Sequence, residues 1–131
     1  MLEQNREGNE LINIYIVLLP NILMLDMVGP AEVFNFANRY SDKQFELHFI
    51  GEHSDIQSGM GLMLRVDPLP EQIKANSWLL IPGLEGEQID FSMPEYQGVV
   101  QWINRHQQFD KVISVCSGTM LLAYCRLLDG R

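Results

Sequence analysis

The stretch Lys111-Val112-Ile113-Ser114-Val115-Cys116-Ser117-Gly118 decides the fold class of this chain. Its first part is an apolar, β-branched run typical of a buried strand over residues 111–116, and residues 118–128 predict a helix. Small residues two positions before and after Cys116 permit a tight turn between the two, as in a nucleophile elbow. The stretch therefore predicts a strand, a tight turn and a helix, with a cysteine at the turn.

The same alternation of strands and helices extends over the rest of the chain. Further apolar runs predict strands over 14–19, 45–50 and 77–81. We expect the strand at 45–50, which alternates polar and apolar residues, to be half-exposed and to lie toward the outside of the sheet.

Helical spacing predicts one helix from Pro30 to about Tyr40 and another from Pro94 to about Gln107. Residues 56–66 predict an irregular β-ribbon. The fold class is therefore α/β: a flavodoxin-like, doubly wound, mostly parallel sheet with helices on both faces.

Length and composition fit one globular domain, with 131 residues of which 47% are hydrophobic. We place that domain at residues 11–131, after a polar leader at 1–10. The chain ends at Asp129-Gly130-Arg131, where a turn into another strand is expected, so the sequence predicts the front part of a C-terminally truncated domain.

Charge and patterning exclude several partners. The formal net charge of −8 disfavours direct contact with nucleic acid. The leader lacks the apolar core of a signal peptide, and no stretch approaches ~18 apolar residues, so we expect a cytoplasmic protein without a membrane partner. Cys116 and Cys125 are expected to point to different places and to form no disulfide. We predict no metal site and no cofactor.

Three segments are expected to meet at the carboxyl edge of the sheet: Asp26, the loop from Pro82 to Gly86, and Cys116. A helix dipole would favour the thiolate of Cys116 and lower its pKa, although a cysteine here can equally be a small packing residue. Asp26, which we place in a loop, either caps backbone N–H groups or serves a site. In an apolar pocket beside a thiolate, its pKa would rise and it could donate a proton.

Three motifs resemble those of the DJ-1/PfpI superfamily, over nearly the whole chain after residue 11. They are Leu25-Asp26-Met27-Val28-Gly29-Pro30-Ala31-Glu32-Val33-Phe34, Ile81-Pro82-Gly83, and Val115-Cys116-Ser117-Gly118 through Leu127-Leu128-Asp129-Gly130-Arg131. The resemblance is closest to the N-terminal domains of AraC-type transcriptional regulators of the GlxA kind and to isocyanide hydratases. It implies that Cys116 takes the nucleophile position and Asp26 that of the acid hydrogen-bonded to it.

Two departures from the superfamily pattern bear on activity. Enzymes of the family tend to carry a Gly-Gly pair whose backbone acts as a donor near the reacting centre, whereas Gly83 is followed here by Leu84. Peptidase-like members place a histidine directly after the nucleophile, where this chain has Ser117. The departures favour a sensor over an enzyme. The segment Phe36-Ala37-Asn38-Arg39 also resembles the end of the corresponding helix in the regulators.

The favoured hypothesis is the ligand-sensing and dimerisation domain of an AraC-family regulator. A small, nitrogenous metabolite would bind around Asp26 and Cys116, with Gly83, Leu84, Ser117 and Gly118 as further ligand-binding residues. The resemblance implies a homodimer that binds DNA only through a C-terminal helix-turn-helix module, which is absent from this chain.

Two alternatives stay open. In an enzyme similar to isocyanide hydratase, Cys116 would attack an electrophilic carbon, Asp26 would exchange protons, and the amides of Ser117 and Leu84 would hold developing charge. In a redox sensor, the thiol of Cys116 would be oxidised.

Overall fold

The computed structural model describes residues 11–86 and 89–125. The strands are β1 (Leu11–Val17), β2 (Gln44–Gly51), β3 (Asp55–Gln57), β4 (Met63–Arg65), β5 (Asp67–Pro68), β6 (Ser77–Ile81) and β7 (Lys111–Ser114). The helices are α2 (Met24–Tyr40), α3 (Pro94–Arg105) and α4 (Gly118–Tyr124). The predicted leader at 1–10 and the end of the predicted helix at 118–128 lie outside the described residues.

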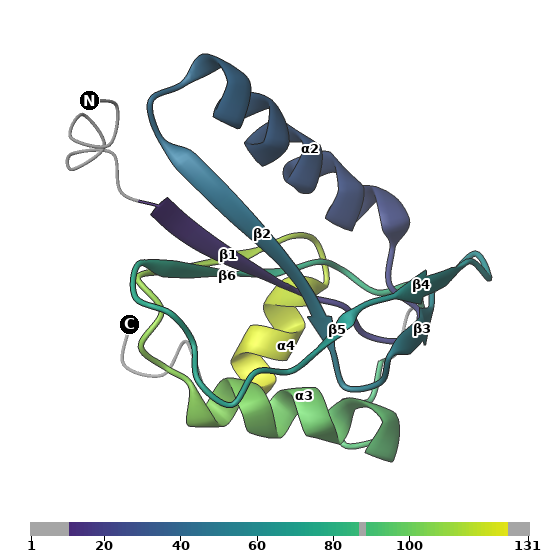
Figure 1. Ribbon diagram of the computed structural model, residues 1–131. Coiled ribbons are helices and arrows are strands. Elements are labelled where there is room, and N and C mark those ends of the chain that lie inside the picture. Colours follow the sequence, from purple (N-terminus) through teal and green to yellow (C-terminus); the bar gives the residue numbers. More distant parts are fainter. Residues whose placement is uncertain (1–10, 87–88, 126–131) are drawn as a thin grey trace.

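The main sheet has the strand order β5-β2-β1-β6-β7, and all of these neighbours pair in parallel. Helix α2 lies over one face of the sheet, and α3 and α4 lie under the other (Figure 1). The apolar run of β1 forms the middle strand because it is covered on both faces, which parallel strands require. The prediction of a doubly wound α/β fold with helices on both faces is confirmed.

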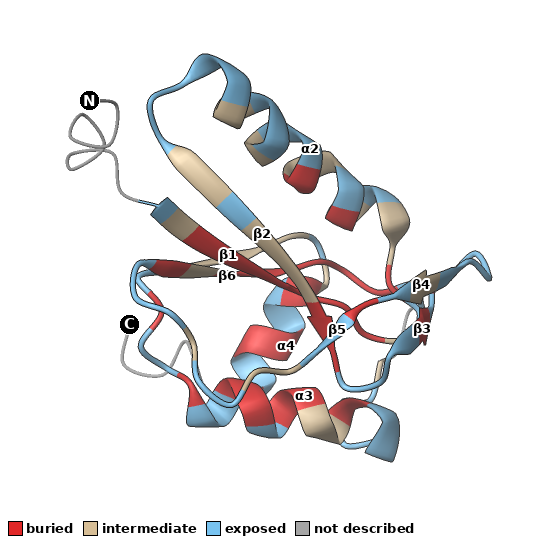
Figure 2. Cartoon of the chain, in the orientation of Figure 1, coloured by how far each residue is buried: buried red, intermediate tan, exposed pale blue. Residues whose placement is uncertain are grey.

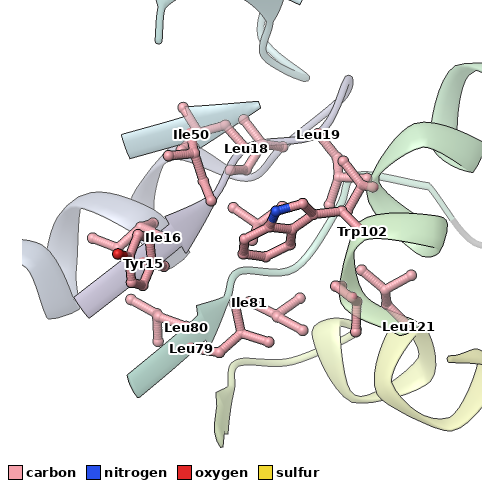
Figure 3. Packing of buried hydrophobic residues seen from close by; sticks show 14 of the residues in the cluster. Tyr15, Ile16, Leu18, Leu19, Ile50, Leu79, Leu80, Ile81, Trp102 and Leu121 are labelled. Atoms are coloured by element: carbon pink, nitrogen blue, oxygen red, sulfur yellow. The ribbon is translucent and has the colours of Figure 1, made fainter. Parts of the chain in front are cut away.

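The core beneath the sheet is built around Trp102 of α3, which is 1% exposed (Figures 2 and 3). Its ring packs near Tyr15 of β1 and Phe109, and its indole N–H donates to the Pro70 carbonyl at 2.6 Å. Leu121 brings α4 into the same core. Aromatic packing with a satisfied indole thus attaches both helices to this face.

The first helix begins earlier than the sequence predicted. Helix α2 starts at Met24, so Asp26 lies in its first turn rather than in a loop, and Pro30 lies inside the helix. A proline in a helix interior costs roughly 3 kcal/mol because it removes one hydrogen bond and crowds the preceding turn. Burial of Met27 and Ala31 against the sheet offsets that cost. Local helix propensity does not include this tertiary burial.

The predicted strands differ from the observed ones mainly at the edges. The strand expected at 45–50 is β2, and only the two-residue β5 lies outside it. The strand expected to be buried over 111–116 ends at Ser114, and β7 is the half-exposed edge of the sheet within the described residues. The predicted ribbon at 56–66 is confirmed as the antiparallel hairpin of β3 and β4. None of the described helices has the length and apolar content needed to cross a membrane.

Candidate functional site

The turn between β7 and α4 presents Cys116. Its φ of 51° lies in the left-handed region, which residues other than glycine rarely adopt. Gly118 is buried, and a Cβ atom there would overlap the carbonyl oxygen of Ile81, so only glycine allows α4 to start this close to β6. Cys116 is exposed as a result. The tight turn predicted from the sequence is present, and the role of Cys116 as a nucleophile stays a prediction.

Gly83, in the loop after β6, is the point where the predicted site residues meet. A Cβ atom placed on Gly83 would lie 2.6 Å from Oδ2 of Asp26, 3.1 Å from Cβ of Cys116 and 3.1 Å from Oγ of Ser117. These three side chains come from α2 and from the turn before α4. The structure therefore brings together Asp26, Gly83, Cys116 and Ser117, whereas the buried Gly118 has a packing position.

Ser117 binds the loop after β6 through its hydroxyl group. The Leu84 N–H donates to Ser117 Oγ at 2.9 Å, and the same hydroxyl donates to the Leu84 carbonyl at 3.3 Å. The backbone amide of Leu84 is thus already engaged. It is not free to donate to a ligand or to developing charge while this hydrogen bond is made.

The segment after β1 holds the other side of this loop. The Leu23 N–H donates to the Gly83 carbonyl at 2.9 Å, and the Glu85 N–H donates to the Asn21 carbonyl at 2.7 Å. Asn21 has a φ of 69°, a backbone conformation that asparagine tolerates better than most residues. Ile22 between them is fully buried. The backbone around the site is therefore fixed by hydrogen bonds between loops that are distant in sequence.

The charge of Asp26 dominates the electrostatics at Cys116. A hydrogen bond from the thiol to the Asp26 carboxylate, then the negative charge of that carboxylate, then slight burial all raise the pKa of Cys116. The expected lowering of this pKa is therefore wrong. A full charge in contact outweighs the partial charge of α4, which has only seven residues. The thiol is protonated at neutral pH.

Asp26 itself has one oxygen without a partner. Its Oδ2 is buried and makes no hydrogen bond to any described residue. A buried acceptor without a donor costs free energy, on the order of 1–3 kcal/mol or more for a charged group. Such a group is unusual in a folded protein and is relieved by a bound hydrogen-bond donor.

An open cavity of about 330 Å³ borders Asp26. Its lining residues are Ile22, Leu23, Met24, Leu25, Asp26, Met60 and Glu85. Among the described residues of the lining, the walls are apolar, the two charged side chains are both acids, and none is basic. Met60 was not assigned to the site from the sequence, because methionines more often fill the core, and the loop between β3 and β4 brings it to the cavity.

The histidines lie in other environments. His48 stacks on Tyr15 with ring centroids 4.7 Å apart and hydrogen-bonds Asn13 at 3.0 Å. His106 packs against Trp102. Both histidine side chains are held by packing contacts with aromatic residues. No three potential metal ligands cluster among residues 11–86 and 89–125.

Comparison with known proteins places this geometry in a known fold. No protein-family model matches the chain. An uncharacterised protein of Streptomyces lividans, from the region 5′ of cpoL, is 26% identical over 122 residues, which is 90% of this chain and 82% of that protein.

Solved structures agree more closely in shape than in sequence. An AraC family transcriptional regulator from Pseudomonas putida superposes with a TM-score of 0.74 at 17% identity, over 90% of this chain and 63% of that one. A two-domain protein of Anabaena variabilis with DJ-1/ThiJ/PfpI-like and ferritin-like domains gives a TM-score of 0.65 at 19% identity, over 92% of this chain and 34% of that one. The chain thus spans less than two thirds of either protein. Its fold is therefore similar to the folds of this AraC family regulator and of this DJ-1/ThiJ/PfpI-like domain.

Proposed function

We propose that this chain is the ligand-sensing and dimerisation domain of an AraC-family transcriptional regulator in the cytoplasm. One observation carries the proposal: Asp26 lines a cavity, and its Oδ2 is buried close to Gly83 without a hydrogen-bond partner among the described residues. A carboxylate that lines a cavity and has an oxygen without a hydrogen-bond partner can bind a ligand that carries a donor.

The cavity also indicates the chemistry of that ligand. Asp26 and Glu85 are carboxylic acids, and the other lining side chains are apolar. A small molecule with a positively charged or N–H-bearing nitrogen would pair with the acids, and a short apolar body would pack against the apolar side chains. The nitrogenous metabolite expected from the sequence fits this lining.

Two contacts favour binding over turnover. Asp26 raises the pKa of the Cys116 thiol, so little thiolate is present at neutral pH. The Leu84 amide, which the enzyme hypothesis assigns to developing charge, donates to Ser117 Oγ. Both features weaken nucleophilic catalysis, since it needs a thiolate and a free donor.

One observation keeps the hydratase-like enzyme as the second candidate. Cys116 is exposed and held in the left-handed region, and strained residues of this kind are often found at active sites. In that enzyme, water would add to an isocyanide carbon to give an N-substituted formamide.

Ligand binding is tested by the thermal shift of the full chain with small alkylamines and alkylammonium salts. Alcohols and carboxylic acids of the same shape serve as comparison compounds. We expect amines alone to raise the melting temperature of wild type, and this effect to be lost in Asp26→Asn and Gly83→Ala. Gly29→Ala is the matched control, because a Cβ atom there meets nothing within 4 Å.

The enzyme candidate is tested by incubation with cyclohexyl isocyanide and chromatography for N-cyclohexylformamide. Product that depends on both Cys116 and Asp26 would replace the sensor proposal with the enzyme. An amine effect that is equal in wild type and Asp26→Asn would refute the assignment of this site. DNA binding is assigned only to a C-terminal helix-turn-helix module, so this chain alone should not bind DNA.

A further inference from the structure

A second cavity, of about 460 Å³, follows helix α2 along the sheet. It lies between α2 and β2, which are neighbours on one face of the sheet in Figure 1. The helix side of the lining consists of Met24, Met27, Val28, Ala31, Glu32 and Asn35, and the strand side consists of Leu47 and Phe49 of β2 and Leu64 of β4. We call this cavity the α2 groove.

The α2 groove is elongated because its helix side is a single stripe. The lining residues of α2 recur at intervals of three and four positions, which places them on one face of the helix. At a helical rise of about 1.5 Å per residue, the stripe from Met24 to Asn35 is roughly 16 Å long. On the other side, Leu47 and Phe49 are alternate residues of β2 and therefore share a face of the sheet. The outer strand β5 pairs with β2 only at the end of β2, so the groove stays open beside Leu47.

The lining of the α2 groove suits an apolar chain. All of its described lining side chains except Glu32 and Asn35 are apolar, and these two are exposed. Sites for small molecules are typically concave, mainly apolar and about 300–1,000 Å³ in volume, and the groove falls in that range. Apolar surface that is open to water is covered favourably by an apolar group. An alkyl chain is therefore a suitable occupant of the groove.

Met24 connects this groove with the candidate site. It lines both the α2 groove and the cavity of about 330 Å³ that Asp26 borders. The two cavities are therefore adjacent, and both are next to the first turn of α2. Met24 is partly buried against the core, and a methionine side chain is unbranched and adapts its shape to what it contacts. A molecule bound at Asp26 can extend past Met24 into the groove.

Charge determines which kind of chain-bearing molecule fits. The charged side chains among the described lining residues of the two cavities are Asp26, Glu85 and Glu32, and all three are acids. A fatty acid would bring a fourth carboxylate next to them and be repelled. An amine of the same length would be attracted by the acids at one end and would bury its chain at the other. The combined lining therefore favours a cationic amphiphile over an anionic one.

We propose that the α2 groove is the apolar half of the ligand site, and that the ligand is an amine with a long alkyl chain. Its nitrogen pairs with Asp26, and its chain passes Met24 and lies in the groove between α2 and β2. This inference deepens the proposed function, and it rests on the assignment of Asp26 as the group that binds nitrogen. It adds the length of the ligand, because the Asp26 cavity by itself accommodates only a short apolar body.

The test is the affinity of the full chain for butylamine, hexylamine, octylamine and decylamine, measured by isothermal titration calorimetry. In wild type, each added methylene that enters the groove should tighten binding about threefold to fourfold. Val28→Trp places a large ring in the groove one turn after Met24, so it should remove most of this gain and leave butylamine binding unchanged. Val33→Trp is the matched control, because Val33 is 66% exposed on the same helix and lines neither cavity. Decanoic acid should bind more weakly than decylamine.

Several results would overturn the inference. Equal affinities for butylamine and decylamine in wild type would do so, and so would a gain with chain length that Val28→Trp keeps or that decanoic acid shows equally. A Val28→Trp protein that changes only its sedimentation would assign the groove to a second copy of the chain instead. The inference and the proposed function fail separately. Butylamine binding that is lost in Asp26→Asn, without any gain with chain length, would remove the groove and keep the site. Amine binding that Asp26→Asn leaves unchanged at every length would refute the site itself.

Discussion

Substitution of Gly83 by alanine tests the whole arrangement of the site. The new Cβ atom would lie 2.6 Å from Asp26 Oδ2 and 3.1 Å from both Cys116 Cβ and Ser117 Oγ. Nonbonded contacts to carbon are ordinarily about 3.5–4.0 Å, so at least one neighbour must move by several tenths of an ångström. The backbone of Gly83 lies outside the left-handed region, so the alanine is opposed by lack of space alone.

Overpacking of this kind costs roughly 1–3 kcal/mol. We therefore expect Gly83→Ala to lower the free energy of unfolding by that amount in urea denaturation. The displaced Asp26 carboxylate should also alter the alkylation rate of Cys116 by iodoacetamide, measured with Cys125→Ser as background. The same experiment on Gly29→Ala should show a gain of up to about 1 kcal/mol and unchanged alkylation. A Gly83→Ala protein with wild-type stability and wild-type alkylation would refute the close approach of these groups.

Three further predictions concern the same region. In Asp26→Asn, loss of the carboxylate charge should lower the pKa of Cys116, and alkylation at pH 8 should become several-fold faster; a slower rate would contradict the cause assigned to the raised pKa. Burial raises the pKa of Cys125 to about 12, so the folded state holds the thiol proton more tightly than the unfolded state. Stability should therefore fall as pH rises above the unfolded thiol pKa of ~8.5, by up to about 1.4 kcal/mol per pH unit, in wild type but less in Cys125→Ser. Ser117→Ala should leave the N–H and carbonyl of Leu84 without their shared partner and cost about 1–2 kcal/mol in urea denaturation, and an unchanged midpoint would show that the loop is held by other contacts.

Local patterns were sufficient for most of the fold. The apolar runs at 14–19 and 77–81 identified two central strands, because strands covered on both faces require continuous apolar sequence. The run at 111–116 identified β7 but overestimated its burial, since this strand is half-exposed. Small residues around Cys116 identified the turn before α4, because the close approach of α4 to β6 leaves no room for larger side chains. The start of α2 was misplaced, since Pro30 is a strong local signal that the burial of Met27 overrides.

The residues of the candidate site were predicted from the sequence, but their electrostatic effect on one another was not. Asp26, Gly83, Cys116 and Ser117 were each identified from the sequence, and the structure brings them together. The direction of the Cys116 pKa shift could not be predicted from the sequence. It depends on the contact between a carboxylate and a thiol that are 90 positions apart in the chain.

The sequence by itself therefore determined the alternation of strands and helices and the tight turn at Cys116. These features depend on neighbours within a few positions, where periodicity and side-chain size act directly. The tertiary structure alone decided that Asp26 keeps the thiol protonated, that Leu84 is bound by Ser117, and that Met60 borders the cavity. Those features depend on distances between segments far apart in the chain, and electrostatic and hydrogen-bond energies follow distance in space.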